Sequence, residues 1–214
     1  MHSPNPQIND KHMMRHCFEL AAKSAGQGEY PYAAVIARNG QIIAETTNRV
    51  AQDHDVTHHA ELMAISLAQA SLGATDLADC TLYANFEPCA LCCYAIRETR
   101  IGKVVFALRS PLMGGASRWN ILGDCTLSDA MPEVFAPPPL VVPGFLGEEA
   151  DQSLRQCAPT VWAFMRARKL LGDHEADDNA PIKAASLRGL ARVTAWIMRA
   201  LRRNFFDRFG RGRC

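Results

Sequence analysis

The sequence lacks any run close to the roughly 18 uninterrupted apolar residues that a membrane-spanning helix needs. It also lacks a charged and then apolar export signal, because the segment Met1–Asp10 is polar and contains two prolines. No internal repeat is present in the 214 residues, of which 48% are hydrophobic. We therefore expect a cytoplasmic protein with one globular domain and an appendage.

Disulfide bonds are not expected either, although the chain has eight cysteines. Without an export signal, such cysteines are reduced thiols or metal ligands. Three of them cluster at Cys89, Cys92 and Cys93. The scattered ones are expected to be small buried hydrophobic residues, and they are Cys17, Cys80, Cys125, Cys157 and Cys214.

A large net charge is missing as well, since the formal value at pH 7 is +1. That value conceals an asymmetry, because residues 181–214 carry nine Lys or Arg against one acid and sum to +8. The remaining 180 residues then sum to −7. This separation of an acidic body from a basic tail gives information on what the protein binds rather than on how it folds.

The basic tail has the pattern of an amphipathic helix. At about 100° per residue, Arg188, Arg192 and Arg199 fall on one face, and Leu190 and Ile197 fall on the opposite face. Such a helix packs on its own acidic body or on a dimer partner, lies on an anionic membrane surface, or contacts RNA phosphates. These alternatives stay open from the sequence.

Residue periodicity in the central part predicts alternating helices and strands. We expect helices over Met13–Ala25, Thr57–Leu72, Cys89–Thr99 and Ala158–Leu171, strands over Tyr32–Ala37, Gln41–Thr47, Thr81–Phe86 and Lys103–Leu108, and a loop over Asn48–Val56. Asn39-Gly40 between the first two strands indicates a hairpin. This order predicts an α/β fold, a three-layer α-β-α sandwich with a mixed central sheet. We expect this domain over residues 1–171, an acidic linker over 172–180 and the tail over 181–214.

Two short segments carry candidate metal ligands, His59-Ala60-Glu61 and Pro88-Cys89-Ala90-Leu91-Cys92. Each is weak alone, because a C-x-x-C pair is also typical of redox sites and structural zinc sites. Together they form the H-x-E…P-C-x-x-C pattern of zinc deaminases that act on nucleobases. One histidine and two cysteine thiolates hold three tetrahedral positions on zinc and leave the fourth for water. Glu61 is then the catalytic group that moves protons rather than a ligand.

From Asn48 to Asn120 the chain resembles the cytidine deaminase-like superfamily, in its branch of tRNA adenosine deaminases, guanine deaminases and related nucleobase or nucleoside deaminases. The resemblance lies in Asn48-Arg49, in 54–57, 59–65 and 100–106, and in Glu87-Pro88-Cys89. It implies zinc on His59, Cys89 and Cys92, proton transfer by Glu61, contact of Asn48 with the substrate, and a homodimer.

The chain departs from this branch in ways that bear on the substrate. His58 replaces a small residue, and we expect it at the surface or in a supporting role. Cys93 points about 100° away from Cys92 on a helix, so we expect it to pack rather than to bind metal. The Asn-His segment of the tRNA enzymes has no counterpart in 127–133.

Three functions follow, in order of preference. The first is zinc-dependent hydrolytic deamination of a small-molecule nucleobase or nucleoside, with release of ammonia. The second is conversion of adenosine to inosine in tRNA, with the basic tail on the RNA backbone. The third is a non-catalytic, zinc-stabilised binding module, against which Glu61 argues, because a structural zinc site has no use for a proton-transfer group.

Overall fold

A computed structural model of the chain describes residues 6–172, and their side chains from residue 9 onward. Its strands are β1 (Ala33–Arg38), β2 (Gln41–Thr47), β3 (Cys80–Phe86), β4 (Lys103–Leu108) and β5 (Leu140–Pro143). Its helices are α1 (Pro6–Gly26), α2 (Val50–Asp53), α3 (Ala60–Leu72), α4 (Ala90–Glu98), α5 (Cys125–Ala130), α6 (Gly147–Cys157) and α7 (Pro159–Ala167).

The five strands form one mixed sheet in the order β2-β1-β3-β4-β5. β1 is antiparallel to β2 and β3, whereas β3, β4 and β5 run parallel. Arg38 pairs with Gln41, so Asn39 and Gly40 alone make the turn, with φ of 51° and 80°. Two residues with positive φ are what a tight hairpin turn needs, and the predicted hairpin is confirmed.

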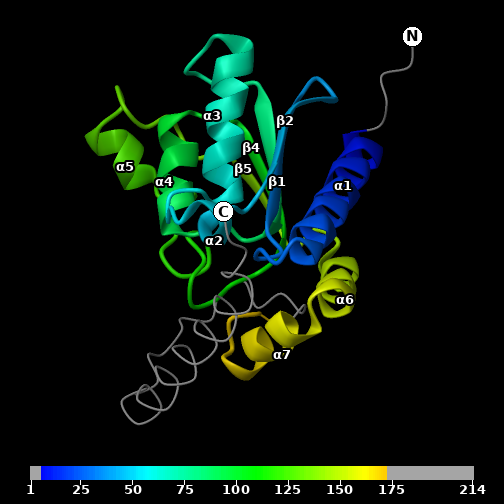
Figure 1. The fold of residues 1–214 in the computed structure, drawn as a ribbon. Coiled ribbons are helices and arrows are strands. Elements are labelled where there is room, and N and C mark those ends of the chain that lie inside the picture. Colours follow the sequence, from blue (N-terminus) through cyan, green and yellow to red (C-terminus); the bar gives the residue numbers. More distant parts are fainter. Residues whose placement is uncertain (1–5, 173–214) are drawn as a thin grey trace. The chain divides into compact units, whose positions relative to one another are not determined.

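Helices cover both faces of this sheet, which confirms the three-layer sandwich (Figure 1). Alternate residues of a strand point to opposite faces, and both faces here are apolar. Ile36, Leu82 and Val104 pack in the layer of α3 and α4. Val35 and Val105 pack in the layer of α1 and α6.

The structure differs from the sequence-based prediction in several elements. The expected loop Asn48–Val56 contains α2, a single turn that begins after Arg49. Beyond residue 110 the structure adds α5, β5 and α6, none of which was expected, and α5 and β5 are too short, at six and four residues, to show a repeat. The first helix begins at Pro6 rather than Met13, since proline is accepted in the first turn of a helix.

None of the described helices is long and apolar enough to cross a lipid bilayer. Apart from Gly172, the expected linker 172–180 and the expected amphipathic tail 181–214 lie outside the described residues.

Candidate active site

The candidate ligands lie where two helices begin beside the sheet. His59 is the N-cap of α3 and Cys89 is the N-cap of α4, and both have extended backbone angles. Cys92 follows in the first turn of α4 and is buried. α3 and α4 pack against each other, so segments 30 residues apart in the sequence meet. The structure thus brings together all three residues that the motif selected.

The three candidate ligand atoms form a nearly equilateral triangle. His59 Nδ1 lies 3.5 Å from Cys89 Sγ and 3.4 Å from Cys92 Sγ, and the two sulfurs are 3.6 Å apart. A tetrahedral zinc ion with ordinary Zn–N and Zn–S bonds separates its ligand atoms by about 3.6 to 3.8 Å. Over the described part of the chain, this is the one cluster of three His, Cys, Asp or Glu side chains that is close enough to share an ion. The donor set therefore fits zinc.

The hydrogen bonds within this triangle favour the thiolate form of one cysteine, Cys89. The Cys92 thiol and the His59 ring hydrogen-bond to Cys89 and lower its pKa to about 4. The same hydrogen bond raises the pKa of Cys92, which keeps the shared proton. The hydrogen bond with Cys89 also raises the pKa of His59. A thiolate is the form of cysteine that binds metal, so Cys89 is prepared for an ion.

Glu61 lies in the first turn of α3, two residues after His59, and is 9% exposed. It is not a member of the ligand triangle, as the sequence predicts. Burial raises the pKa of its carboxyl group. A carboxyl group with a raised pKa is suited to exchanging protons near neutral pH.

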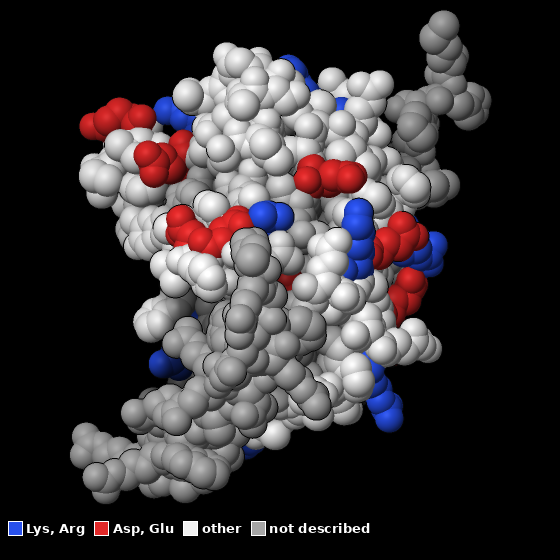
Figure 2. Space-filling model, viewed as in Figure 1, with Lys and Arg blue, Asp and Glu red and all other residues white. Residues whose placement is uncertain are grey.

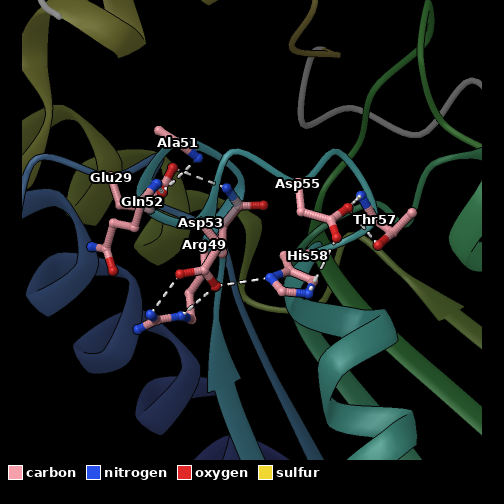
Figure 3. A network of polar contacts seen from close by, with 9 residues as sticks. Glu29, Arg49, Ala51, Gln52, Asp53, Asp55, Thr57 and His58 are labelled. Carbon is pink, nitrogen blue, oxygen red and sulfur yellow. Dashed lines mark hydrogen bonds and ion pairs between the residues drawn. The ribbon is translucent and has the colours of Figure 1, made fainter.

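Asn48 lies directly after β2 and is 3% exposed. Its side-chain Nδ2 donates a hydrogen bond of 3.0 Å to Glu29 Oε1. The buried carboxylate of Glu29 also accepts a hydrogen bond from the backbone N–H of Tyr30. It accepts two more from the backbone N–H groups of Ala51 and Gln52 (Figure 3). Glu29 therefore fixes both the amide of Asn48 and the start of α2.

A second set of polar contacts closes the loop that precedes His59. The Asp53 carboxylate pairs with the Arg49 guanidinium at 2.7 Å and with His58 Nδ1 at 2.8 Å (Figure 3). These two partners lower the pKa of Asp53 to about 2. The backbone N–H of Arg49 donates to the carbonyl of His58 at 3.0 Å. His58 thus helps to hold the loop that precedes His59, and its role in the reaction stays a prediction.

Some residues near the site were missed or only partly understood from the sequence. Glu29 and Glu87 are buried carboxylates to which no sequence pattern gives a role. Glu87 directly precedes the Pro88-Cys89 motif, which could have drawn attention to it, whereas Glu29 lies in no motif. Cys93 is fully buried and its Sγ lies 3.4 Å from the Pro88 carbonyl, so its predicted packing role is confirmed.

The sequence of this chain is similar to those of known deaminases. Residues 7–108 match the family model described as the cytidine and deoxycytidylate deaminase zinc-binding region. The tRNA-specific adenosine deaminase of Aquifex aeolicus is 35% identical over 122 residues, which cover 56% of this chain and 81% of that protein. The tRNA-specific adenosine deaminase of Haemophilus influenzae is 34% identical over 149 residues, which cover 68% and 80%.

Solved structures give a similar result. A structure from work on A-to-I editing by tRNA:A34 deaminases matches with a TM-score of 0.57 at 28% identity, over 67% of this chain and 99% of that chain. A structure of guanine deaminase from Nitrosomonas europaea matches with a TM-score of 0.54 at 26% identity, over 68% and 82%. The matches in sequence and in fold therefore lead to the same group of deaminases.

Proposed function

The chain belongs to the cytidine deaminase-like superfamily and is a zinc-dependent hydrolytic deaminase of a nucleobase or nucleoside, and from this premise we propose which residues carry the reaction. His59, Cys89 and Cys92 hold the zinc ion, Glu61 transfers protons and Asn48 contacts the substrate. One observation carries this proposal. The three ligand atoms converge to 3.4–3.6 Å, while a buried carboxyl group two residues after the first ligand stays outside the triangle.

When bound, zinc supplies Lewis-acid chemistry that lowers the pKa of a coordinated water. Glu61 accepts a proton from the attacking water and delivers it to a ring nitrogen of the substrate. In the second half of the reaction Glu61 takes the proton of the newly added hydroxyl group and passes it to the departing amino group, so the carbonyl forms as the C–N bond breaks and the amine leaves as ammonia. The Asn48 amide, fixed by Glu29, orients the ring or its sugar in the pocket.

The substrate that we propose is a small purine base or nucleoside. The named relatives act on adenosine in tRNA or on guanine, and both compounds are purines with an exocyclic amino group. A small substrate fits the charge of the body, since residues 1–180 sum to −7. In the view of Figure 2, blue side chains are scattered, some of them beside red ones, and no continuous basic area forms on the described part of that face.

A specific observation favours a second candidate, adenosine in a tRNA anticodon. Both relatives compared in sequence carry the name tRNA-specific adenosine deaminase, and this chain spans 81% and 80% of their lengths. This substrate needs contacts with RNA phosphates, which the sequence offers in the basic tail.

Ammonia release from the zinc-loaded protein distinguishes the candidates. The substrates to be compared are guanine, adenine, adenosine, cytosine, cytidine and an anticodon stem-loop. Turnover of a free purine supports the first candidate, and turnover of the stem-loop alone supports the second. Absence of turnover with every substrate would contradict the assignment of the site.

We further propose that the protein is a homodimer. Leu67 on α3 and Leu91 and Tyr94 on α4 are exposed apolar side chains in the helical layer that carries the site. Exposed apolar groups that gather in one layer favour contact with a partner. Light scattering should give twice the chain mass of 23.5 kDa. The cytoplasmic location and the contacts of the tail with RNA or an anionic membrane stay predictions.

A further inference from the structure

One buried carboxylate beside the site has no part in the reaction described above. Glu87 lies between the end of β3 and Cys89 and is 4% exposed. In the described part of the chain no Lys or Arg side chain forms an ion pair with it. A buried charge of this kind persists only where hydrogen bonds replace its hydration.

Four donors satisfy the Glu87 carboxylate, and all belong to one loop. Oε2 accepts the backbone N–H of Ser110 at 2.6 Å and the hydroxyl of Ser117 at 2.7 Å. Oε1 accepts the N–H groups of Ala116 at 3.1 Å and Ser117 at 2.5 Å. The carboxylate thus joins the first residue of the 110–117 loop to its last.

The closed loop lies directly against a proposed zinc ligand. Gly114 forms a β-bridge with Cys89, and the N–H of Gly115 donates to the carbonyl of Pro88 at 2.8 Å. A Cβ atom on Gly114 would overlap the Glu87 carboxylate, and one on Gly115 would overlap the sulfur of Cys93. The loop therefore approaches the helix start more closely than any side chain would permit.

We propose that Glu87 is a positioning residue, which closes the 110–117 loop against the Cys89 segment and so fixes one wall of the substrate pocket. Cys89 is partly exposed, so a substrate that approaches this residue would pass the loop beside it. Glu87 acts on substrate binding through this loop and neither binds the metal nor moves a proton. The proposal rests on the proposed site, because the pocket is the one beside Cys89.

The test compares Glu87→Gln with wild type in the zinc-loaded full chain. A glutamine turns an amide N–H₂ toward backbone donors, so the loop loses acceptors without losing volume. We expect amide hydrogens of 110–117 to exchange at least about tenfold faster, while those of α3 stay unchanged. KM for the best substrate should rise at least about tenfold, with kcat changed less than about threefold and the zinc content unchanged.

Two matched variants keep the test decisive if Glu87→Gln folds poorly. Ser117→Ala removes one of the four hydrogen bonds and should shift exchange and KM in the same direction by a smaller factor. Ser110→Ala keeps all four bonds, since its hydroxyl has no partner among the described residues, and should match wild type. Unchanged exchange and KM in both Glu87→Gln and Ser117→Ala would overturn the proposal, as would a fall in global stability with KM unaltered. An inactive wild type would contradict the proposed function, whereas the exchange measurement would still test Glu87.

Discussion

Glu61 is the residue on which the proposed chemistry depends most directly. Its carboxyl group is buried in the first turn of α3, and burial raises its pKa. We expect Glu61→Gln to lower kcat by about 10² to 10⁴, the range that a positioned proton-transfer group contributes. The variant should bind zinc as wild type does, because Glu61 lies outside the ligand triangle. Ammonia release and metal analysis on the same sample check both points. A variant that loses its zinc would show that Glu61 is a ligand instead.

The affinity of the site for zinc should depend on pH with a definite sign. Hydrogen bonds with Cys89 raise the pKa of Cys92 and of His59, so both groups hold protons that zinc must displace. Metal binding releases these protons, and affinity therefore rises with pH and falls as the solution is acidified. Competition with a chelator between pH 5.5 and 8.5 measures the trend. His59→Ala should lose zinc throughout this range, and an affinity independent of pH would contradict the proposed ligand set.

The ligand residues of the triangle could be predicted from the sequence because each part of the motif spans only a few consecutive residues. His59 and Glu61 are two apart and Cys89 and Cys92 are three apart, so each pair is fixed by the start of one helix. Glu29 and Glu87 could not be predicted in the same way. Their partners are backbone N–H groups of segments 22 to 30 residues away, and a backbone group leaves no mark in the sequence.

At the scale of elements, Arg97 joins α4 to residues 121–136, the segment after β4 that contains α5. It is 1% exposed, and its guanidinium donates to carbonyls of Ile121, Asp124 and Ala136 and to the hydroxyl of Ser128. Arg97→Met leaves these acceptors without their donor, and we expect a loss of about 3 kcal/mol in unfolding free energy. That corresponds to a fall in Tm of about 6 to 12 °C for a chain of this size.

The neighbouring Arg100 offers the control for this prediction. Its side chain is 39% exposed and its ion pair with Asp76 spans 3.9 Å. Exposed pairs of this kind contribute little to stability, so Arg100→Met should change the unfolding free energy by less than about 0.5 kcal/mol. Thermal melts of both variants give the comparison. Equal effects would show that Arg97 does not anchor the segment.

The elements that the sequence predicted best are those with a full apolar repeat. β1, β3 and β4 are buried along most of their length, and their patterns placed them within one or two residues. β5 has four residues that are only half buried or exposed, and α5 has six residues, none of them buried. Such elements depend on contacts with the rest of the fold rather than on their own periodicity.

At the scale of the whole molecule, the sandwich follows from the order of helices and strands, whereas the choice of substrate does not. The family model covers the metal site and the strands β1 to β4, and it ends at residue 108, before β5. The 110–117 loop and the segments after it lie beyond this match. Their conformations depend on contacts such as those of Glu87 and Arg97, which no short pattern encodes.

The charge asymmetry of the chain yields a prediction that separates the two candidate substrates. If the basic tail binds RNA phosphates, each neutralised phosphate releases counterions, and the logarithm of affinity falls with the logarithm of salt concentration by about 0.7 to 0.9 per contact. Replacement of Arg199, Arg202 and Arg203 by Gln should then reduce that slope for an anticodon stem-loop by about 2 to 3. Fluorescence anisotropy between 50 and 200 mM salt measures it. Deamination of a free purine should be the same in both proteins, because the site lies in α3 and α4. A slope that the three replacements leave unaltered would exclude RNA as the partner of these arginines and would favour a small substrate.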